Sequence, residues 1–226
     1  MENNMRIVCI SDTHGKHFGL NLPSGDIIVH AGDFSGHGHM IDSIKFLNWF
    51  NTLPFKNKIL ISGNHDIWME QANPSELKAV IPSGITYLND SGVNIDGINF
   101  WGSPVQPRFF NWAFNRDRGS QIKYHWDLIP NDVDILITHG PAYKILDQAP
   151  RGYGQTESVG CTDLLDAIKR TRPKLHICGH IHNSYGFKNV DETLFVNASL
   201  VDEEYKLVNN PIVVDISKNT AKIINY

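Results

Sequence analysis

The sequence predicts an α/β fold whose parallel strands are buried on both faces. Five runs of β-branched and aliphatic residues have the length and continuity of such strands, at 6–11, 26–30, 58–61, 134–137 and 174–178. Segments with helical spacing separate several of these runs, and this alternation is typical of α/β proteins. At 226 residues the chain suits a single domain, 1–226, with room for a large core.

Three segments have helical patterns. Residues 40–50 place Ile41, Ile44 and Leu47 on one face. Residues 74–81 start with Pro74, a common first helical residue, and residues 160–172 end before Pro173. Residues 85–102 and 186–224 have the alternation of short strands joined by turns. The sequence therefore provides helices to cover a buried sheet.

A short polar motif follows each of the five strand-like runs. The motifs are Asp12-x-His14, Gly32-Asp33, Gly63-Asn64-His65-Asp66, Thr138-His139-Gly140-Pro141 and Gly179-His180-Ile181-His182. Open α/β sheets bind ligands at the carboxyl ends of their strands, so these motifs can converge. Two carboxylates, an Asn and four His suit two neighbouring divalent cations, which would also compensate the buried negative charge. The sequence thus predicts a dinuclear metal site.

Each motif alone also has a structural interpretation. The Asp12 motif could be a helix cap and turn, and Gly63-Asn64 could be a left-handed turn. Gly140-Pro141 could simply end a strand. His180 and His182 are more specific, because alternate residues of an extended segment point the same way. The conjunction of all five motifs, each after a strand, favours the metal site.

In this order, the motifs resemble those of the calcineurin-like metallophosphoesterase superfamily: D-x-H, G-D, G-N-H-[DE], a His before Gly or Pro, and G-H-x-H. The likeness covers residues 6–216. Segments 9–14, 134–141 and 196–199 further resemble the metallophosphoesterase-domain-containing (239FB-type) phosphodiesterases. The resemblance implies a calcineurin-like phosphoesterase fold, a four-layer α-β-β-α sandwich with two mixed sheets flanked by helices. It also implies hydrolysis of small phosphodiesters, including cyclic nucleotides.

The resemblance assigns a role to each motif residue. One metal is implied to take Asp12, His14, Asp33 and His182, and the other Asp33, Asn64, His139 and His180, so that Asp33 bridges. His65 is implied to stand beside the reacting phosphate, with Asp66 orienting its imidazole. A His oriented in this way can give a proton to a leaving alkoxide near neutral pH. Alternatively, Asp66 caps a helix that begins near Ile67.

The implied mechanism is in-line attack by a metal-bridging hydroxide, since a divalent cation lowers the pKa of water from 15.7 to about 7. Imidazole and carboxylate ligands suit Mn, Fe, Zn and Co, with Mn favoured. Within the same fold, a phosphomonoesterase or protein phosphatase is the alternative, because such a cluster activates water opposite any phosphate ester. A non-catalytic binding scaffold is a further alternative, which the complete ligand set disfavours.

Two segments are candidates for substrate recognition. Residues 101–114 are rich in aromatic residues and include Arg108 and Phe110, and the Gly/Pro-rich loop 149–154 carries Arg151. Aromatic rings can stack on a nucleobase, and Arg can hold a phosphate. We therefore take Arg108, Phe110 and Arg151 as candidate contacts for a small, nucleotide-type phosphodiester. The alternative is that the aromatic residues pack in the core or form an oligomer surface.

Charge and cysteine usage indicate the setting. The net charge is −4 and no basic stripe is visible, which argues against a long nucleic acid as partner. The three cysteines are odd in number and two lie in strand-like runs, so we expect reduced, buried thiols and a cytoplasmic location. We expect neither a signal peptide nor contact with a membrane. The sequence does not indicate an oligomeric state.

Overall fold

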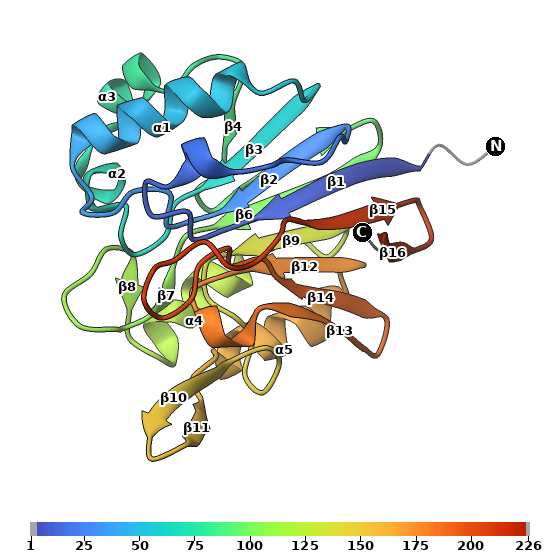
Figure 1. Ribbon diagram of the computed structural model, residues 1–226. Helices are drawn as coiled ribbons and strands as arrows, with labels where there is room; N and C mark the ends of the chain where they lie inside the picture. Colours follow the sequence, from blue (N-terminus) through green and yellow to red (C-terminus); the bar gives the residue numbers. More distant parts are fainter. Residues whose placement is uncertain (1–3, 225–226) are drawn as a thin grey trace.

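The computed structural model describes residues 4–224 and contains two six-stranded mixed sheets (Figure 1). The first consists of β1 (Met5–Ile10), β2 (Ile27–Ala31), β3 (Asn57–Ile61), β4 (Thr86–Tyr87), β15 (Ile212–Ile216) and β16 (Ala221–Ile224). The second consists of β5 (Ser91–Ile95), β6 (Ile98–Ser103), β9 (Ile135–Thr138), β12 (Leu175–Cys178), β13 (Gly186–Val190) and β14 (Thr193–Asn197).

The strand order explains why the polar motifs meet. The orders are β16-β15-β1-β2-β3-β4 and β13-β14-β12-β9-β6-β5. Pairing is parallel from β1 to β4 and from β6 through β9 and β12 to β14, whereas β15, β16, β5 and β13 pair antiparallel. The five strands expected from the sequence are all present in these parallel blocks. Their carboxyl ends therefore lie along one edge of each sheet.

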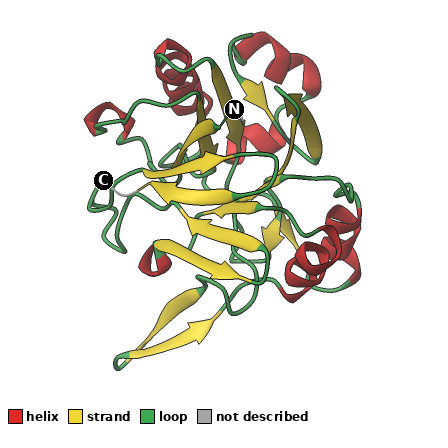
Figure 2. Cartoon of the chain, turned by 90° about the vertical axis from the view of Figure 1, so that its right-hand side faces the viewer, coloured by secondary structure: helices red, strands yellow, loops and turns green. Residues whose placement is uncertain are grey.

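Helices cover the outer face of each sheet (Figure 2). Those of the first sheet are α1 (Met40–Thr52), α2 (Ile67–Gln71) and α3 (Pro74–Val80), and those of the second are α4 (Ser120–Asp127) and α5 (Thr162–Thr171). Short 3-10 helices span His17–Gly19 and His182–Ser184. The expected helix 160–172 begins at Thr162, because the Gly160 N–H donates to the Asp147 carboxylate and the Cys161 N–H donates to the Pro141 carbonyl.

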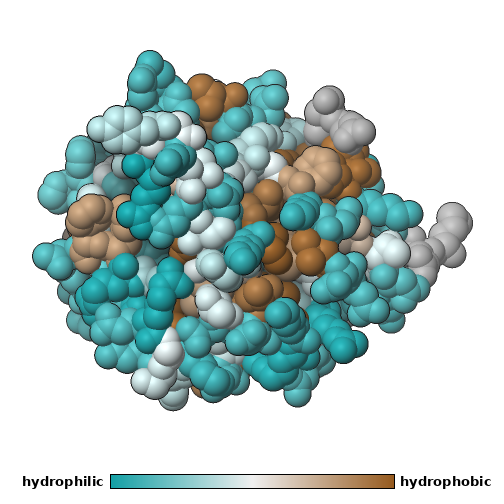
Figure 3. Space-filling view, turned by 90° about the horizontal axis from the view of Figure 1, so that it is seen from below, coloured by the Kyte–Doolittle hydropathy of each residue, from teal (hydrophilic) through white to brown (hydrophobic). Residues whose placement is uncertain are grey.

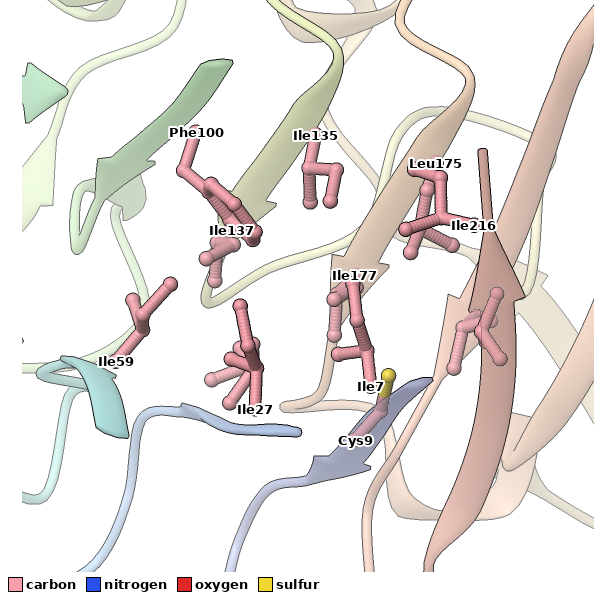
Figure 4. Packing of buried hydrophobic residues seen from close by; sticks show 14 of the residues in the cluster. Ile7, Cys9, Ile27, Ile59, Phe100, Ile135, Ile137, Leu175, Ile177 and Ile216 are labelled. Carbon is pink, nitrogen blue, oxygen red and sulfur yellow. The ribbon is translucent and has the colours of Figure 1, made fainter. Parts of the chain in front are cut away.

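Three apolar clusters fill the spaces between the four layers. Between the sheets, Ile7 and Ile59 of the first face Ile137 and Ile177 of the second (Figure 4). A second cluster joins the first sheet to α1, and a third joins the second sheet to α4 and α5. Seen from below, apolar residues form limited areas within a mostly hydrophilic surface (Figure 3). The four-layer α-β-β-α sandwich expected from the sequence is confirmed.

The structure differs from expectation around residues 148–158. The segment interpreted as a Gly/Pro loop is a β-hairpin of β10 (Gln148–Gly152) and β11 (Gln155–Ser158), which protrudes from the body (Figures 1 and 2). Its tip accepts a tight reversal because Gly152, Tyr153 and Gly154 have φ of 87°, 50° and 74°. A second small ribbon pairs β7 (Gln106–Pro107) with β8 (Asn115–Arg116). Among residues 4–224, no helix has the length and apolar character to cross a membrane.

Candidate metal centre and cleft

The five polar motifs converge where the two sheets meet at their carboxyl edges. Backbone hydrogen bonds join neighbouring motifs: Asp12 donates to Gly32 (2.9 Å), His14 to Asp33 (3.0 Å) and Gly179 to His139 (2.9 Å). The Asp12 carboxylate crosses between the sheets, because it accepts bonds from the His180 N–H (3.1 and 3.0 Å) and the Ser199 hydroxyl (2.9 Å). The loops thus hold one another in place, and the seven expected ligands lie in one cluster.

Three groups of side chains in this cluster bring their ligand atoms within 4.8 Å of one another. The groups are Asp12, His14 and His182; His14, Asp33 and His65; and Asp33, His139 and His180. Asp33 Oδ2 lies 3.8 Å from His14 Nε2 and 3.3 Å from His139 Nε2. Asp33 therefore stands between the two halves of the cluster, where a bridging carboxylate belongs. Asn64 joins the second half, with Oδ1 3.0 Å from His139 Nε2.

Four of the seven expected ligands have left-handed backbone. The φ angles of Asp12, His14, Asp33 and His180 are 54°, 42°, 56° and 68°. Asp and His tolerate this region better than most residues, but it still costs about 1 kcal/mol or more at each position. Such strain persists only where the surroundings determine the conformation, and it gathers at functional sites. The contacts within the cluster therefore hold the backbone at these strand ends in the left-handed conformation.

Two glycines allow the loops to approach this closely. A Cβ on Gly63 would stand 2.3 Å from Asp33 Oδ1, and one on Gly179 would stand 2.1 Å from Asp12 Oδ2. The Asp33 carboxylate and backbone nitrogen occupy the first position, and the Asp12 carboxylate and Ser11 side chain occupy the second, so no larger residue fits. The glycines of the third and fifth motifs thus make room for the two carboxylates.

Backbone carbonyls fix the protonation of three imidazoles. The Nδ1 atoms of His139, His182 and His65 lie 2.9, 3.0 and 2.9 Å from the carbonyls of Ala31, Asp202 and Gly36. A carbonyl only accepts, so each Nδ1 carries a proton, and Nε2 is left for the site. Partners of this kind orient ligating histidines and make them more basic. No sequence pattern points to the Asp202 carbonyl, because any residue type supplies one.

The two carboxylates give the cluster a negative field. Burial alone would raise the pKa of Asp12, but the hydrogen bond and charge of His182 outweigh burial and hold the pKa well below its usual range. Burial likewise opposes ionisation of Asp33, and His139 holds the pKa of that carboxyl low. In turn, burial disfavours the charged form of His139, but Asp33 overcomes it and raises the pKa of His139 to about 9. The ionised carboxylates therefore attract positive charge, which a cation bound between them could supply in place of the His139 proton.

The imidazoles of His14 and His180 stay neutral. Burial lowers the pKa of His14 to about 4 and that of His180 to about 3. Both ring nitrogens of His14 are buried without a hydrogen-bond partner among residues 4–224. Neutral nitrogens with free lone pairs beside ionised carboxylates are the donors that divalent cations accept. The residues present thus fit two such cations.

Asp66 does not play the expected part. Its carboxylate accepts from the backbone N–H groups of Asp33 (3.0 Å), Gly63 (2.8 Å) and Ser35 (2.9 Å) and from the Ser35 hydroxyl (2.8 Å). Because His65 Nδ1 bonds to Gly36 instead, the expectation that Asp66 orients this imidazole is wrong. Asp66 occupies the N-cap position of α2 without a side-chain cap bond. Burial and then the charge of Asp33 raise its pKa to about 7. Its carboxylate organises the loops around Asp33.

His65 lies at the border between the cluster and an open cleft. Its ring stacks on Trp112 with centroids 4.1 Å apart and meets the His14 ring edge-on at 4.6 Å. The cleft of about 550 Å³ reaches from His65, Asp33 and Asn64 to His180 and His182. A molecule in the cleft therefore touches both halves of the cluster and His65.

Two aromatic side chains, Phe109 and Tyr205, form cleft walls beside different halves of the cluster. Phe109 lies 5.6 Å from the His180 ring, and Tyr205 lies 4.7 Å from the His14 ring, measured between centroids. Both line the cleft and are about half exposed. Tyr205 has φ of 59° in a turn held by Asp202, whose carboxylate accepts from the Glu204 and Lys206 N–H groups. Sequence reasoning did not single out Tyr205, because its position depends on this irregular turn.

The three expected substrate contacts lie in different surroundings. Arg108 lines the cleft and forms an exposed ion pair with Asp117, at 2.6 Å. Phe110 is 74% exposed and is not among the residues lining the cleft, whose wall contains its neighbour Phe109. Arg151, on the protruding hairpin, pairs with Glu157 and does not line the cleft either. Of the three, the structure brings only Arg108 to the site.

Comparisons with known proteins show which family this chain resembles. A family model described as calcineurin-like phosphoesterase matches residues 5–184. Metallophosphoesterase domain-containing protein 1 of Homo sapiens is 38% identical over 234 residues, covering 93% of this chain and 71% of that protein. A UPF0046 protein of Caenorhabditis elegans is 36% identical over 228 residues, covering 96% and 77%. A solved Thermus thermophilus structure shares the fold, with TM-score 0.60 and 14% identity over 99% of each chain.

Proposed function

The chain belongs to the calcineurin-like phosphoesterase family, and from this premise we propose that it is a metal-dependent phosphodiesterase for small, nucleotide-type phosphodiesters. The observation that carries the proposal is the cleft: it joins the ligand cluster, His65 and two aromatic walls in one space of about 550 Å³. A substrate bound there would place its phosphate on the cluster and its organic groups between the walls.

The seven clustered residues are proposed to hold two divalent cations. Asp12, His14 and His182 would hold one, Asn64, His139 and His180 the other, and Asp33 would touch both. When bound, such cations supply the Lewis acidity that polarises a phosphate ester and lowers the pKa of water. Oxygen and imidazole donors without thiolate suit manganese, the metal we favour.

His65 is proposed to protonate the leaving group. Its Nδ1 proton is committed to the Gly36 carbonyl, and the Trp112 ring fixes the plane of the imidazole. The free nitrogen can then carry a proton toward an alkoxide in the cleft, as a general acid does near neutral pH. Asp66 contributes indirectly, because it holds the Asp33 and Gly63 backbone.

Charge in the cleft favours a diester over a monoester. Arg108 is paired with Asp117, and Arg118 donates to the carbonyls of Gly160 (2.8 Å) and Val159 (2.6 Å). Glu203 adds a negative charge to the lining. A diester carries one negative charge at phosphorus and a monoester up to two. A diester therefore needs fewer cationic side chains than a monoester. This lower need matches a cleft in which the guanidinium groups of Arg108 and Arg118 already have partners.

The walls favour a substrate with a planar group. Phe109 and Tyr205 lie beside His180 and His14, which belong to different halves of the cluster. Aromatic rings stack on any nucleobase, at about 1–3 kcal/mol per base. A cyclic or linear nucleotide diester satisfies this geometry together with the single charge.

The proposal is tested by hydrolysis assays with defined metals. The protein is stripped with a chelator, reloaded with Mn²⁺, and assayed with bis(4-nitrophenyl) phosphate, 4-nitrophenyl phosphate and cyclic nucleotides. We expect Mn²⁺-dependent turnover, with kcat/KM larger for the diesters than for the monoester. Preference for the monoester would identify a phosphomonoesterase, and metal binding without turnover on any ester would support a scaffold. Either result would overturn the proposal.

A further inference from the structure

Two buried histidines outside the ligand cluster occupy matching places in the two sheets. His30 lies in β2 and His176 in β12, and neither is exposed. Their chain neighbours Val29 and Ile177 belong to the core between the sheets. Strand alternation therefore turns both imidazoles to the outer, helix-covered faces. There His30 packs 4.9 Å from the Phe46 ring, and His176 packs 5.4 Å from that of Phe195.

The hydrogen bonds of His30 show which of its ring nitrogens carries the proton. Its Nδ1 accepts from the Gly32 N–H at 3.3 Å, so the proton of the neutral ring is on Nε2. Nε2 lies 3.0 Å from the Thr13 hydroxyl and therefore donates to it. Burial, which lowers the pKa of His30 to about 3, keeps the ring in this neutral form. His30 thus fixes the Thr13 side chain.

His176 repeats this arrangement in the second sheet. The Thr138 hydroxyl donates to the Gly140 carbonyl at 2.7 Å, so it must accept from His176 Nε2, 2.8 Å away. The bond from Thr138 to Gly140 spans His139, the residue between them. His176 therefore fixes a short hydrogen-bonded turn, residues 138–140, that contains the expected ligand His139.

The residues beside these threonines need such support. Thr13 stands between Asp12 and His14, which both have left-handed backbone, with φ of 54° and 42°. Two such residues on either side of a third are costly, and the conformation persists only if neighbouring contacts determine it. A side chain also binds its metal ion more weakly when no neighbouring group fixes the orientation of that side chain. A fixed hydroxyl at Thr13 meets both requirements.

We propose that His30 and His176 are paired positioning residues, each acting through a threonine hydroxyl on one half of the metal cluster. His30 and Thr13 hold the half with Asp12 and His14, and His176 and Thr138 hold the half with His139. This inference rests on the metal site of the proposed function. It adds the prediction that substitutions at residues that touch no metal weaken metal binding in one half of the cluster at a time.

Mn²⁺ titration of the metal-free protein by calorimetry tests the inference without substrate. Thr13→Val and Thr138→Val keep the side-chain shape and remove the hydroxyl. Each should weaken one of the two Mn²⁺ equivalents by roughly 10- to 100-fold, the usual cost of losing an outer partner of a metal ligand. Thr13→Ser and Thr138→Ser restore the hydroxyl and should return the affinity to within about threefold of the parent.

Combination with a ligand substitution identifies the half affected. His14→Ala should remove the first equivalent, so adding Thr13→Val should change the remaining affinity little, whereas adding Thr138→Val should weaken it. Such non-additivity marks residues that act on one site. His30→Phe and His176→Phe should reproduce the loss of their threonine partners, and each double variant should lose no more than its single variants.

Thr193→Val is the matched control. Its hydroxyl is buried and donates to the Pro173 carbonyl at 2.6 Å, at the opposite end of β14 from the cluster. It should lose stability as the test variants do and keep both Mn²⁺ affinities. Parental affinities in Thr13→Val and Thr138→Val, failure of the serine variants to rescue, or an equal loss in Thr193→Val would overturn the inference. A parent that binds two Mn²⁺ and cleaves no diester would instead overturn only the proposed function.

Discussion

The ligand cluster and the cleft walls are built on different principles. The seven ligands follow strands of both sheets, and Asp12, Asp33, Asn64 and His139 are at most 2% exposed. The walls are parts of connecting segments, residues 108–114 and 202–206, where Phe109 and Tyr205 are 47% and 41% exposed. Chemistry is thus placed by the packed sheets, and selectivity is left to segments that can vary without disturbing them.

The two regions also differ in how far a change spreads. Within the cluster, one carboxylate serves several neighbours: Asp33 faces His14 and His139, and its Oδ1 accepts the His65 N–H at 2.7 Å. In the walls, the side chains and their ion pairs are largely exposed, such as the pair of Arg108 with Asp117. We therefore expect substitutions in the cluster to affect both metals and the chemical step, and substitutions in the walls to affect substrate affinity.

The largest effect is expected at the centre of the cluster. Asp33→Asn removes the charge shared by the two halves, so both metal positions should be lost or weakened. Turnover should fall by about 10²–10⁴, the worth of several kcal/mol of charge stabilisation. Metal content by mass spectrometry and kcat on a diester measure the two effects. His14→Ala is the comparison, since it should mainly empty one position; two retained metals and parental turnover in Asp33→Asn would refute the bridge.

Sequence reasoning succeeded for the cluster because strand ends leave a strong pattern. An apolar run fixes the strand, and a polar residue directly after it must lie at the edge of a parallel sheet. The same logic failed for Asp66, because the chain turns after Asn64 and directs that carboxylate to the Asp33 and Ser35 backbone. Hydrogen bonds to main-chain groups carry no residue signature, and this is also why the Gly36 and Asp202 carbonyls could not be foreseen.

A smaller, more selective effect is expected at His65, where the cluster borders the cleft. His65→Ala should keep both metals and lose about 10²–10⁴ in kcat on an ester with an alkoxide leaving group. The loss should be much smaller with nitrophenolate, which leaves without a proton. Parallel assays on the two esters, with metal analysis, separate these outcomes. Equal losses on both esters, or loss of metal, would show that His65 does not act as the acid.

The walls should show the complementary behaviour. Phe109→Ala and Tyr205→Ala should raise KM for nucleotide diesters by roughly five- to a hundredfold, as expected for a lost stacking contact, and leave kcat nearly unchanged. A small diester without a base should be hardly affected. Steady-state kinetics on both substrates is the measurement. Phe110→Ala and Arg151→Ala are the matched controls, since both residues lie outside the cleft lining. A similar rise in KM in these controls would support the assignment of Phe110 and Arg151 as substrate contacts made from the sequence.

The walls were harder to predict because neighbouring residues there face different ways. Phe109 and Phe110 are adjacent, yet Phe110 has φ of 47° and is turned to solvent. Tyr205 likewise depends on a turn around Asp202. Composition identified an aromatic segment but could not say which ring enters the cleft, because no regular period relates position to direction in such segments.

The smallest effect concerns the stability of the buried region itself. Burial lowers the pKa of His176 from 6.5 to about 3, so the folded protein keeps this ring neutral where the unfolded chain protonates it. Between these values the unfolded state binds more protons, and His176 makes stability fall as the pH falls. From pH 6.5 to 5.5 this amounts to about 1 kcal/mol for one such group.

His176→Gln should remove this part of the acid sensitivity. Gln has an N–H for the Thr138 hydroxyl and does not titrate, so the metal-free variant should lose about 1 kcal/mol less than the parent between pH 6.5 and 5.5. Urea unfolding at the two pH values gives the difference directly. His37→Gln, which removes an exposed imidazole, should behave like the parent. Identical pH dependence in His176→Gln and the parent would mean that the ring is protonated in the fold. The Thr138 hydroxyl would then be held by an imidazolium, and acid would not weaken the support of His139.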